Sequence, residues 1–78
     1  MENFKGQFGY ALCDEDADYL TVSTDIYDIY RYIVDNEIRG DRGEYIREGI
    51  FDESNLIHDF EECTDVDMNL YEYCQYIV

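Results

Sequence analysis

Four aspartates stand at a spacing that could bind calcium. Positions 1, 3, 5 and 12 of an EF-hand-like loop, whose oxygens would converge on the ion, correspond to Asp14, Asp16, Asp18 and Asp25. Position 6 of such a loop requires glycine for a sharp turn, but this chain has Tyr19 there. The preceding residues also favour a strand and not the helix of an EF-hand. We therefore interpret the acidic segment as a charged hairpin turn and predict no metal site.

The other residues with catalytic chemistry do not form a recognisable site. His58 is the only histidine, and the helix expected around it places it beside Ile57, at the margin of the core or in solvent. The cysteines are widely spaced and include no CxxC pair: Cys13, Cys63 and Cys74. The sequence has no glycine-rich phosphate loop and no Cys/His metal spacing. We therefore predict that the chain is not an enzyme and carries no cofactor.

Negative charge is the dominant feature of the sequence. Twenty Asp and Glu face five Lys and Arg, which gives a net charge of −15. Solubility alone requires a net charge of only about 2–8 in magnitude for a small domain. The excess costs stability through self-repulsion, and it would attract basic grooves that normally hold nucleic acid. The acids are densest in residues 14–18 and in the stretch from Glu48 to Val78, which has no Lys or Arg.

These two clusters predict a surface that binds a basic protein. Acids three or four apart on a helix lie roughly 5–6 Å from one another at Cβ. Duplex DNA carries a charge about every 1.7 Å of its axis, so rows of carboxylates can approximate its charge density. The alternative is that the acids only solvate polar faces. The residues expected to contact the partner are Asp14, Glu15, Asp16, Asp18, Asp52, Glu53, Asp59, Glu61, Glu62, Asp65, Asp67 and Tyr71.

Tyrosines are the second indication of an interface. Tyr27 and Tyr32 lie off the apolar line of the first expected helix, and Tyr71 and Tyr76 lie off that of the last. Exposed tyrosine suits an interface because it offers a large, stiff contact area with a polar tip. A homodimer or a partner surface would use these side chains. Alternatively, a small core wraps around them.

A β-hairpin and a helix are predicted for the first half of the chain. Residues 4–13 alternate aromatic with polar side chains, and residues 19–23 are rich in β-formers, so the first acidic cluster would lie at a hairpin turn. Residues 24–39 predict a helix. Its inward face would consist of residues at i, i+3, i+4 and i+7 spacing, namely Ile26, Ile29, Tyr30 and Ile33.

The second half predicts further helices. Residues 39–49 suit a loop and one short helix that ends at Gly49. Asp52 or Ser54 can cap another helix, with inward residues Leu56, Ile57, Phe60 and Cys63. Thr64 can cap a last helix with inward residues Val66, Leu70, Tyr73, Cys74 and Ile77, and a strand over 71–78 is the alternative. The expected fold class is α+β, with an N-terminal β-hairpin followed by three or four helices packed on it.

The length of 78 residues suits one domain, residues 1–78. A hydrophobic share of 46% argues against the disorder that such a charge would otherwise favour. The start, from Met1 to Lys5, lacks the basic and apolar regions of a signal peptide, and no apolar run approaches the ~20 residues of a transmembrane helix. We expect a cytoplasmic protein with reduced thiols that contacts neither membrane nor nucleic acid directly.

In size, charge and lack of catalytic features, the chain resembles the small acidic inhibitors encoded by phages and mobile elements. That group includes DNA-mimic proteins that block restriction enzymes, glycosylases or CRISPR effector complexes. The resemblance covers the whole chain in general character and carries no residue roles over. It implies a non-enzymatic inhibitor, such as an anti-CRISPR or antirestriction protein, acting on a basic nucleic-acid-binding site in the host cytoplasm. An immunity or antitoxin-like protein that caps a basic toxic enzyme, and a small dimeric regulatory module, are the alternatives.

Overall fold

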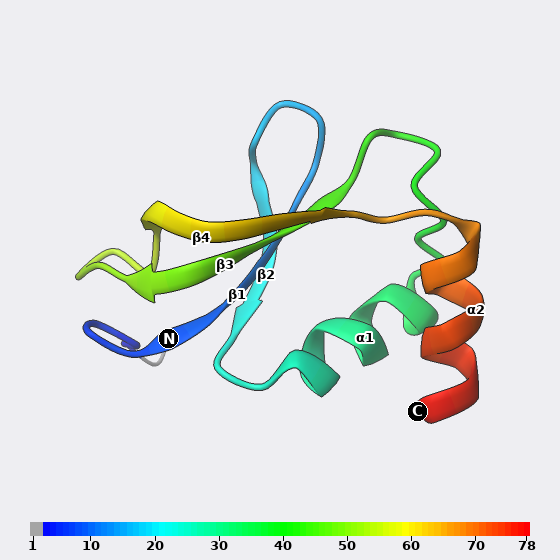
Figure 1. The fold of residues 1–78 in the computed structure, drawn as a ribbon, viewed down its shortest axis with the longest axis horizontal. Helices are drawn as coiled ribbons and strands as arrows, with labels where there is room; N and C mark the ends of the chain where they lie inside the picture. Colours follow the sequence, from blue (N-terminus) through cyan, green and yellow to red (C-terminus); the bar gives the residue numbers. More distant parts are fainter. Residues whose placement is uncertain (1–2) are drawn as a thin grey trace.

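The computed structural model describes the backbone of residues 3–78 and, apart from residues 59–61, their side chains. Within this range the chain forms one antiparallel sheet of strand order β2-β1-β3-β4, with two helices against one face (Figure 1). The elements are β1 (Phe8–Cys13), β2 (Tyr19–Ser23), α1 (Ile26–Asp35), β3 (Tyr45–Phe51), β4 (Ile57–Asp65) and α2 (Met68–Ile77). None of the described helices is long and apolar enough to cross a membrane.

The hairpin and the first helix are present, with shorter bounds than expected. β1 starts at Phe8 because the preceding residues turn back, with the Gln7 N–H donating to the Phe4 carbonyl at 2.9 Å. α1 begins after Asp25, whose side chain accepts from the Tyr27 N–H. It ends at Asp35, and the Ile38 N–H then donates to the Ile33 carbonyl, a bond that closes the end of the helix.

The expected fold class is wrong in the middle of the chain. Residues 45–51 and 57–65 form strands, so two further strands extend the hairpin where helices were expected. β3 lies between β1 and β4 and pairs with both, a long-range arrangement that no local pattern encodes. Register irregularities in the β3–β4 pair interrupt the alternation that would have indicated strands. Of the inward residues expected for a helix here, Ile57 is buried, whereas Leu56 and Cys63 are exposed.

The last helix is present but starts later than expected. Asp67 caps it by accepting from the Leu70 N–H, whereas Thr64 belongs to β4. The strand considered for residues 71–78 is therefore wrong. Tyr71 and Cys74 form the buried side of the helix, and Tyr73, expected inside, is exposed.

Two small cores lie on opposite faces of the twisted sheet. The larger core packs β1 and β3 against the two helices, and its buried members include Leu12, Ile29, Ile33, Ile46 and Cys74. The smaller core holds Ala11, Cys13, Phe51 and Ile57 on the face that carries no described helix. Burial raises the pKa of the Cys13 thiol and raises that of Cys74 to about 11, so both side chains act as small apolar groups.

A half-buried arginine completes the smaller core. The Arg47 guanidinium donates to the Tyr19 hydroxyl at 3.2 Å and to the Tyr45 hydroxyl at 3.0 Å. The Tyr19 hydroxyl also accepts from the Ile57 N–H at 2.9 Å, so β2 is tied to the start of β4 across this face. These bonds explain how the face of the sheet without described helices can still bury side chains.

Candidate functional site

One end of the sheet collects acidic side chains from three connections. Cys13 pairs with Tyr19 and Tyr45, and Tyr45 pairs with Asp65, so these residues form one row across the sheet. The β1–β2 turn, the loop before β3 and the segment after β4 therefore leave the sheet at the same end (Figure 1). We call this region the acidic end, and it comprises Asp14, Glu15, Asp16, Asp18, Asp41, Asp65 and Asp67.

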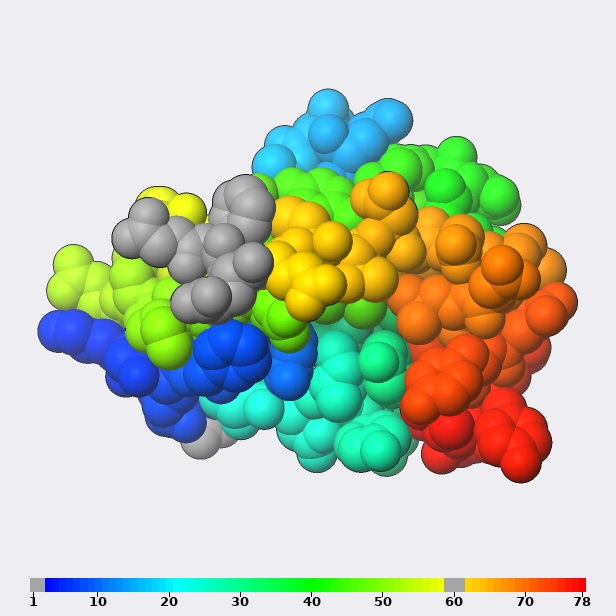
Figure 2. Space-filling model, in the orientation of Figure 1, coloured from blue at the N-terminus to red at the C-terminus, as the bar shows by residue number. Residues whose placement is uncertain are grey.

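Two glycines show how closely these connections pack. A Cβ on Gly43 would lie 3.1 Å from Glu15 Cβ, so the loop before β3 touches the β1–β2 turn. A Cβ on Gly40 would lie 1.9 Å from the Val66 carbonyl oxygen, so the same loop also touches the segment after β4. Figure 2 shows the turn and the loop as neighbouring parts of the surface. The acidic end is therefore one continuous region that residues distant in sequence build together.

Hydrogen bonds within the β1–β2 turn fix its carboxylates. One oxygen of Asp14 accepts from the Asp16 N–H at 2.9 Å and from the Asp18 N–H at 3.0 Å. The Asp14 N–H donates to the Asp18 carbonyl at 3.0 Å, and the Ala17 N–H donates to the Asp14 carbonyl at 3.0 Å. Asp14 therefore supports the turn, whereas the exposed carboxylates of Asp16 and Asp18 make no ion pair with a described residue.

The calcium-like spacing does not produce an EF-hand. Oxygens of Asp14, Asp16 and Asp18 lie within 4.8 Å of one another, but the bonds of the turn account for this arrangement. Asp25, the fourth aspartate of the pattern, caps α1 instead. The flanking elements are strands, as the sequence predicted. We assign no metal to the turn.

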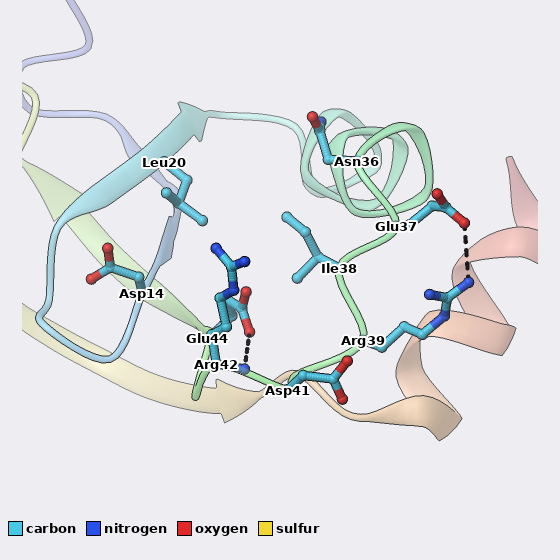
Figure 3. A pocket seen from close by; sticks show the side chains of 9 residues that line it. All are labelled: Asp14, Leu20, Asn36, Glu37, Ile38, Arg39, Asp41, Arg42 and Glu44. Atoms are coloured by element: carbon cyan, nitrogen blue, oxygen red, sulfur yellow. Dashed lines mark hydrogen bonds and ion pairs between the residues drawn. The ribbon is translucent and has the colours of Figure 1, made fainter.

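A cavity of about 420 Å³ lies beside the acidic end. Figure 3 shows Arg42 between Asp14 and Ile38, while Arg39 pairs with Glu37 on the far side at 3.1 Å. The lining mixes both signs of charge and therefore selects neither anions nor cations. For this reason the candidate site is the acidic end and not the cavity.

The structure separates the second predicted cluster into parts. Asp65 and Asp67 join the first cluster, whereas Asp52 and Glu53 lie in the β3–β4 turn, at the opposite end of the sheet. The nine-residue strand β4 runs from one of these ends to the other. At the usual rise of about 3.3 Å per residue, the two groups of acids lie on the order of 25 Å apart. Glu62 lies between them in β4. The side chains of two further predicted contacts are outside the described residues, namely Asp59 and Glu61.

Asp52 has a structural role within its own turn. Its carboxylate accepts from the Ser54 N–H at 2.7 Å and the Leu56 N–H at 3.0 Å, and it pairs with His58 Nε2 at 2.6 Å. The pKa of Asp52 is lowered, chiefly by the hydrogen bond from Leu56 and further by those from Ser54 and His58. These contacts stabilise the charged form of the carboxylate and hold it within the turn.

Tyr71, one of the predicted partner contacts, is buried in the larger core. Its side chain is only 5% exposed, and the Arg39 guanidinium lies over its ring, 4.8 Å from the centroid. The other tyrosines of the helices are more accessible: Tyr27 and Tyr73 flank half-buried Tyr30 edge-on at 6.0 Å each. Tyr76 is 89% exposed. The helices therefore do expose tyrosines, but the exposed set includes Tyr73 and not the predicted Tyr71.

Sequence reasoning also missed one acid of the site. Asp41 stands between Arg39 and Arg42, so the local charge balance concealed it. Only the packing of its loop against the β1–β2 turn brings it to the acidic end.

Comparison of the chain with protein-family models, with curated proteins and with solved structures found no match. The functional argument therefore rests on the geometry described above.

Proposed function

We propose that the protein is a non-enzymatic inhibitor whose acidic end binds the basic nucleic-acid-binding site of a host defence or DNA-processing protein. The observation that supports this function is the gathering of carboxylates from three connections at one end of the sheet. None of them makes an ion pair within the described part of the chain. A surface of this kind costs folding energy through self-repulsion, and a basic partner would relieve it.

The charge density of the acidic end supports competition with nucleic acid. Neighbouring strands lie about 4.8 Å apart, so the four-stranded sheet is about 14 Å wide between its outer strands. A duplex carries about eight charges along that length of axis. The acidic end has seven carboxylates at one end of this sheet. A groove that neutralises phosphates at this density would therefore also neutralise the acidic end.

The positions of the four arginines support a one-sided surface. Arg31 pairs with Asp28 on α1, and Arg47 is held among tyrosines inside the smaller core. Arg39 is held by Glu37 and Tyr71, and Arg42 lies at the adjacent cavity. Arg42 lies beside Asp14, but none of these side chains forms an ion pair with a described carboxylate of the β1–β2 turn. The net attraction is therefore directed outward, toward a partner.

Displacement by DNA tests the proposed mechanism. The chain is immobilised, host proteins are captured from lysate, and the column is washed with duplex DNA at low salt. We expect the DNA to release the specific partner, because both ligands compete for one basic groove. The affinity of the purified partner should also fall steeply as salt rises. A partner that resists elution by DNA would contradict DNA mimicry and support the immunity or antitoxin-like alternative, in which a different basic surface is capped.

Two charge-matched variants locate the interface. Asp16→Asn combined with Asp18→Asn removes two charges from the acidic end, and Glu53→Gln combined with Glu72→Gln removes two exposed charges elsewhere. An exposed ion pair contributes about 0.3–1 kcal/mol, so the first variant should bind the purified partner roughly three- to thirtyfold more weakly at low salt. The second should bind like the native chain. Equal losses in both variants would show that net charge alone matters and would exclude a localised interface.

A further inference from the structure

The outer edge of β4 has backbone groups that pair with no described strand. β4 ends the strand order and contacts only β3 within the sheet. The Val66 N–H donates to the Glu44 carbonyl at 3.0 Å. Val66 and Glu44 are therefore a hydrogen-bonded pair that continues the β3–β4 ladder by one residue. Because such pairs alternate along antiparallel strands, Thr64 and Glu62 bond inward to β3. The N–H and C=O groups of the intervening residues, including Cys63, therefore face outward.

This edge is also uncovered on both faces. Four consecutive residues of β4 are exposed, from Glu62 to Asp65, although a strand that packs on one face exposes only alternate residues. Figure 2 shows these residues, coloured yellow to orange, on the surface of the molecule. The opposite edge is different, because Tyr19 ties β2 to Ile57 and Ser23 is buried. β4 is thus the more accessible of the two outer strands.

A groove beside this edge has the chemistry of a site for a cationic side chain. It has a volume of about 270 Å³ and lies between the sheet and the helices. Glu48 and Glu62 line it from directly opposite positions on β3 and β4, together with the rings of Tyr10 and Tyr30. No Lys or Arg is among its described lining residues. The exposed carboxylate of Glu62 would attract a cationic side chain. Tyrosine rings add attraction for a guanidinium or ammonium group.

We propose that the edge of β4 between Glu62 and Asp65 binds an extended, Lys- or Arg-bearing segment of a partner as an additional strand. Main-chain bonds to Cys63 would supply affinity, and one cationic side chain would enter the groove beside Glu62. A second copy of this chain is a poor occupant, because pairing β4 with itself places acids against acids. The edge site would add a second contact to the proposed inhibitor. It rests on the proposed function in one respect only, namely that the partner is basic.

Peptide probes test the main-chain pairing directly. The probe is a capped ten-residue peptide of alternating arginine and threonine, measured by calorimetry at about 0.15 M salt, where long-range attraction is screened. Two further peptides carry N-methyl groups on either the odd or the even residues. Only alternate residues of an added strand face β4. We therefore expect one methylated peptide to bind at least tenfold more weakly than the parent and the other to bind nearly as well. Equal binding by all three would overturn the proposal.

A proline substitution tests the edge from the side of the protein. Cys63→Pro removes an outward N–H and keeps the inward bonds of the ladder, because proline is tolerated at such edge positions. Cys63→Thr changes the same side chain and keeps the donor. We expect the proline variant to bind the parent peptide at least tenfold more weakly and the threonine variant to bind it normally. Should the proline variant not fold, Glu62→Gln, which weakens only the groove, is expected to reduce binding by several-fold, and normal binding would contradict the proposal.

Two other outcomes are separable from failure of the proposed function. A concentration-dependent dimer that Cys63→Pro dissolves would make a second copy the occupant and overturn the inference. If duplex DNA fails to displace the partner but the peptide results hold, the DNA-mimic function is wrong while the edge site stands. If the peptides fail and the Asp16 and Asp18 variant still loses partner binding, the acidic end stands alone.

Discussion

The two hairpin turns of the molecule share one backbone design and use it differently. In each, an aspartate N–H donates to the carbonyl four residues on, at 3.0 Å for Asp14 and 2.8 Å for Asp52. In each, the carboxylate accepts from the N–H groups two and four residues on. The fourth residue of each turn has positive φ, 63° at Ala17 and 58° at Asn55. The same local bonds therefore form both turns.

Their surroundings differ. Asn55 is buried and accepts from the Phe4 N–H at 2.8 Å, and Glu53 accepts through its carbonyl from the Asn3 side chain at 2.8 Å, so this turn anchors the N-terminal segment. The carboxylates of the first turn make no hydrogen bond to another described segment, and the turn carries exposed acids at Glu15, Asp16 and Asp18. The comparison suggests that one turn serves folding and the other serves recognition. The predictions below test that division, beginning with the largest expected effect.

Asn55→Ala should destabilise the protein by about 2–3 kcal/mol. Alanine tolerates positive φ less well than asparagine, at a cost of about 1 kcal/mol. Loss of the side-chain acceptor leaves the Phe4 N–H without this partner, at about 1–2 kcal/mol more. Urea denaturation measures the change. Asn55→Gly loses the same side-chain contacts but adopts positive φ without strain, so it should cost less than Asn55→Ala. Equal costs would contradict the contribution of backbone strain.

Asp14→Ala should destabilise the protein by about 0.5–2 kcal/mol. Its carboxylate satisfies two backbone N–H groups, as a helix cap does, and alanine cannot replace it. Asp16→Ala is the matched control, because that side chain makes no hydrogen bond in the described structure and its loss relieves repulsion. We expect the control to leave the free energy of unfolding within about 0.5 kcal/mol of the native value. A large loss in the control would show that recognition acids also support the fold.

Ala17→Asn should stabilise the first turn by about 0.5–1 kcal/mol. Ala17 adopts the conformation that Asn55 adopts in the other turn, and asparagine accepts it at lower cost. The measurement is again the urea midpoint. Ala17→Val should have the opposite effect, since a β-branched side chain is poorly compatible with positive φ. The partner should bind Ala17→Asn normally, because no charge of the acidic end changes.

Local patterns predicted the elements whose determinants are local. The hairpin around residues 14–18 and the helix after Asp25 follow from turn chemistry, capping and periodicity. β3 and β4 could not be found in this way, because their pairing is long-range and irregular in register. The position of Tyr71 was also missed. Val66 was counted in the last helix but precedes it, and the buried side of that helix includes Tyr71 in place of the predicted Tyr73.

Only part of the acidic end could be predicted, because only part of it is formed by residues that are neighbours in the sequence. The cluster from Asp14 to Asp18 is visible in the sequence as a turn. Asp65 and Asp67 lie beside this cluster because of the register of β4 against β3. Asp41 lies beside it because the loop before β3 packs against both the β1–β2 turn and the segment after β4. Charge density along the chain therefore identified the kind of surface. The sheet determines which acids share it.

The smallest expected effect concerns pH. The folded-state pKa of Asp52 is lowered, so its charged form is favoured by folding, chiefly through the bond from Leu56. A lowered pKa gives stability that is present above the unfolded pKa of about 4 and is lost as pH falls through the folded value. Asp52→Asn keeps an acceptor for the turn and removes the titration. The native chain should therefore exceed this variant in stability at pH 5, and that advantage should shrink as the pH falls below about 4.

Glu53→Gln is the control for this measurement. Lowering pH relieves the general repulsion among the acids in every variant, so only the difference between the native chain and Asp52→Asn isolates the turn. Glu53 makes no side-chain hydrogen bond in the described structure, and its variant should follow the native chain across the same range. If the native advantage over Asp52→Asn persisted unchanged at pH 3, the charge of Asp52 would not contribute to its turn.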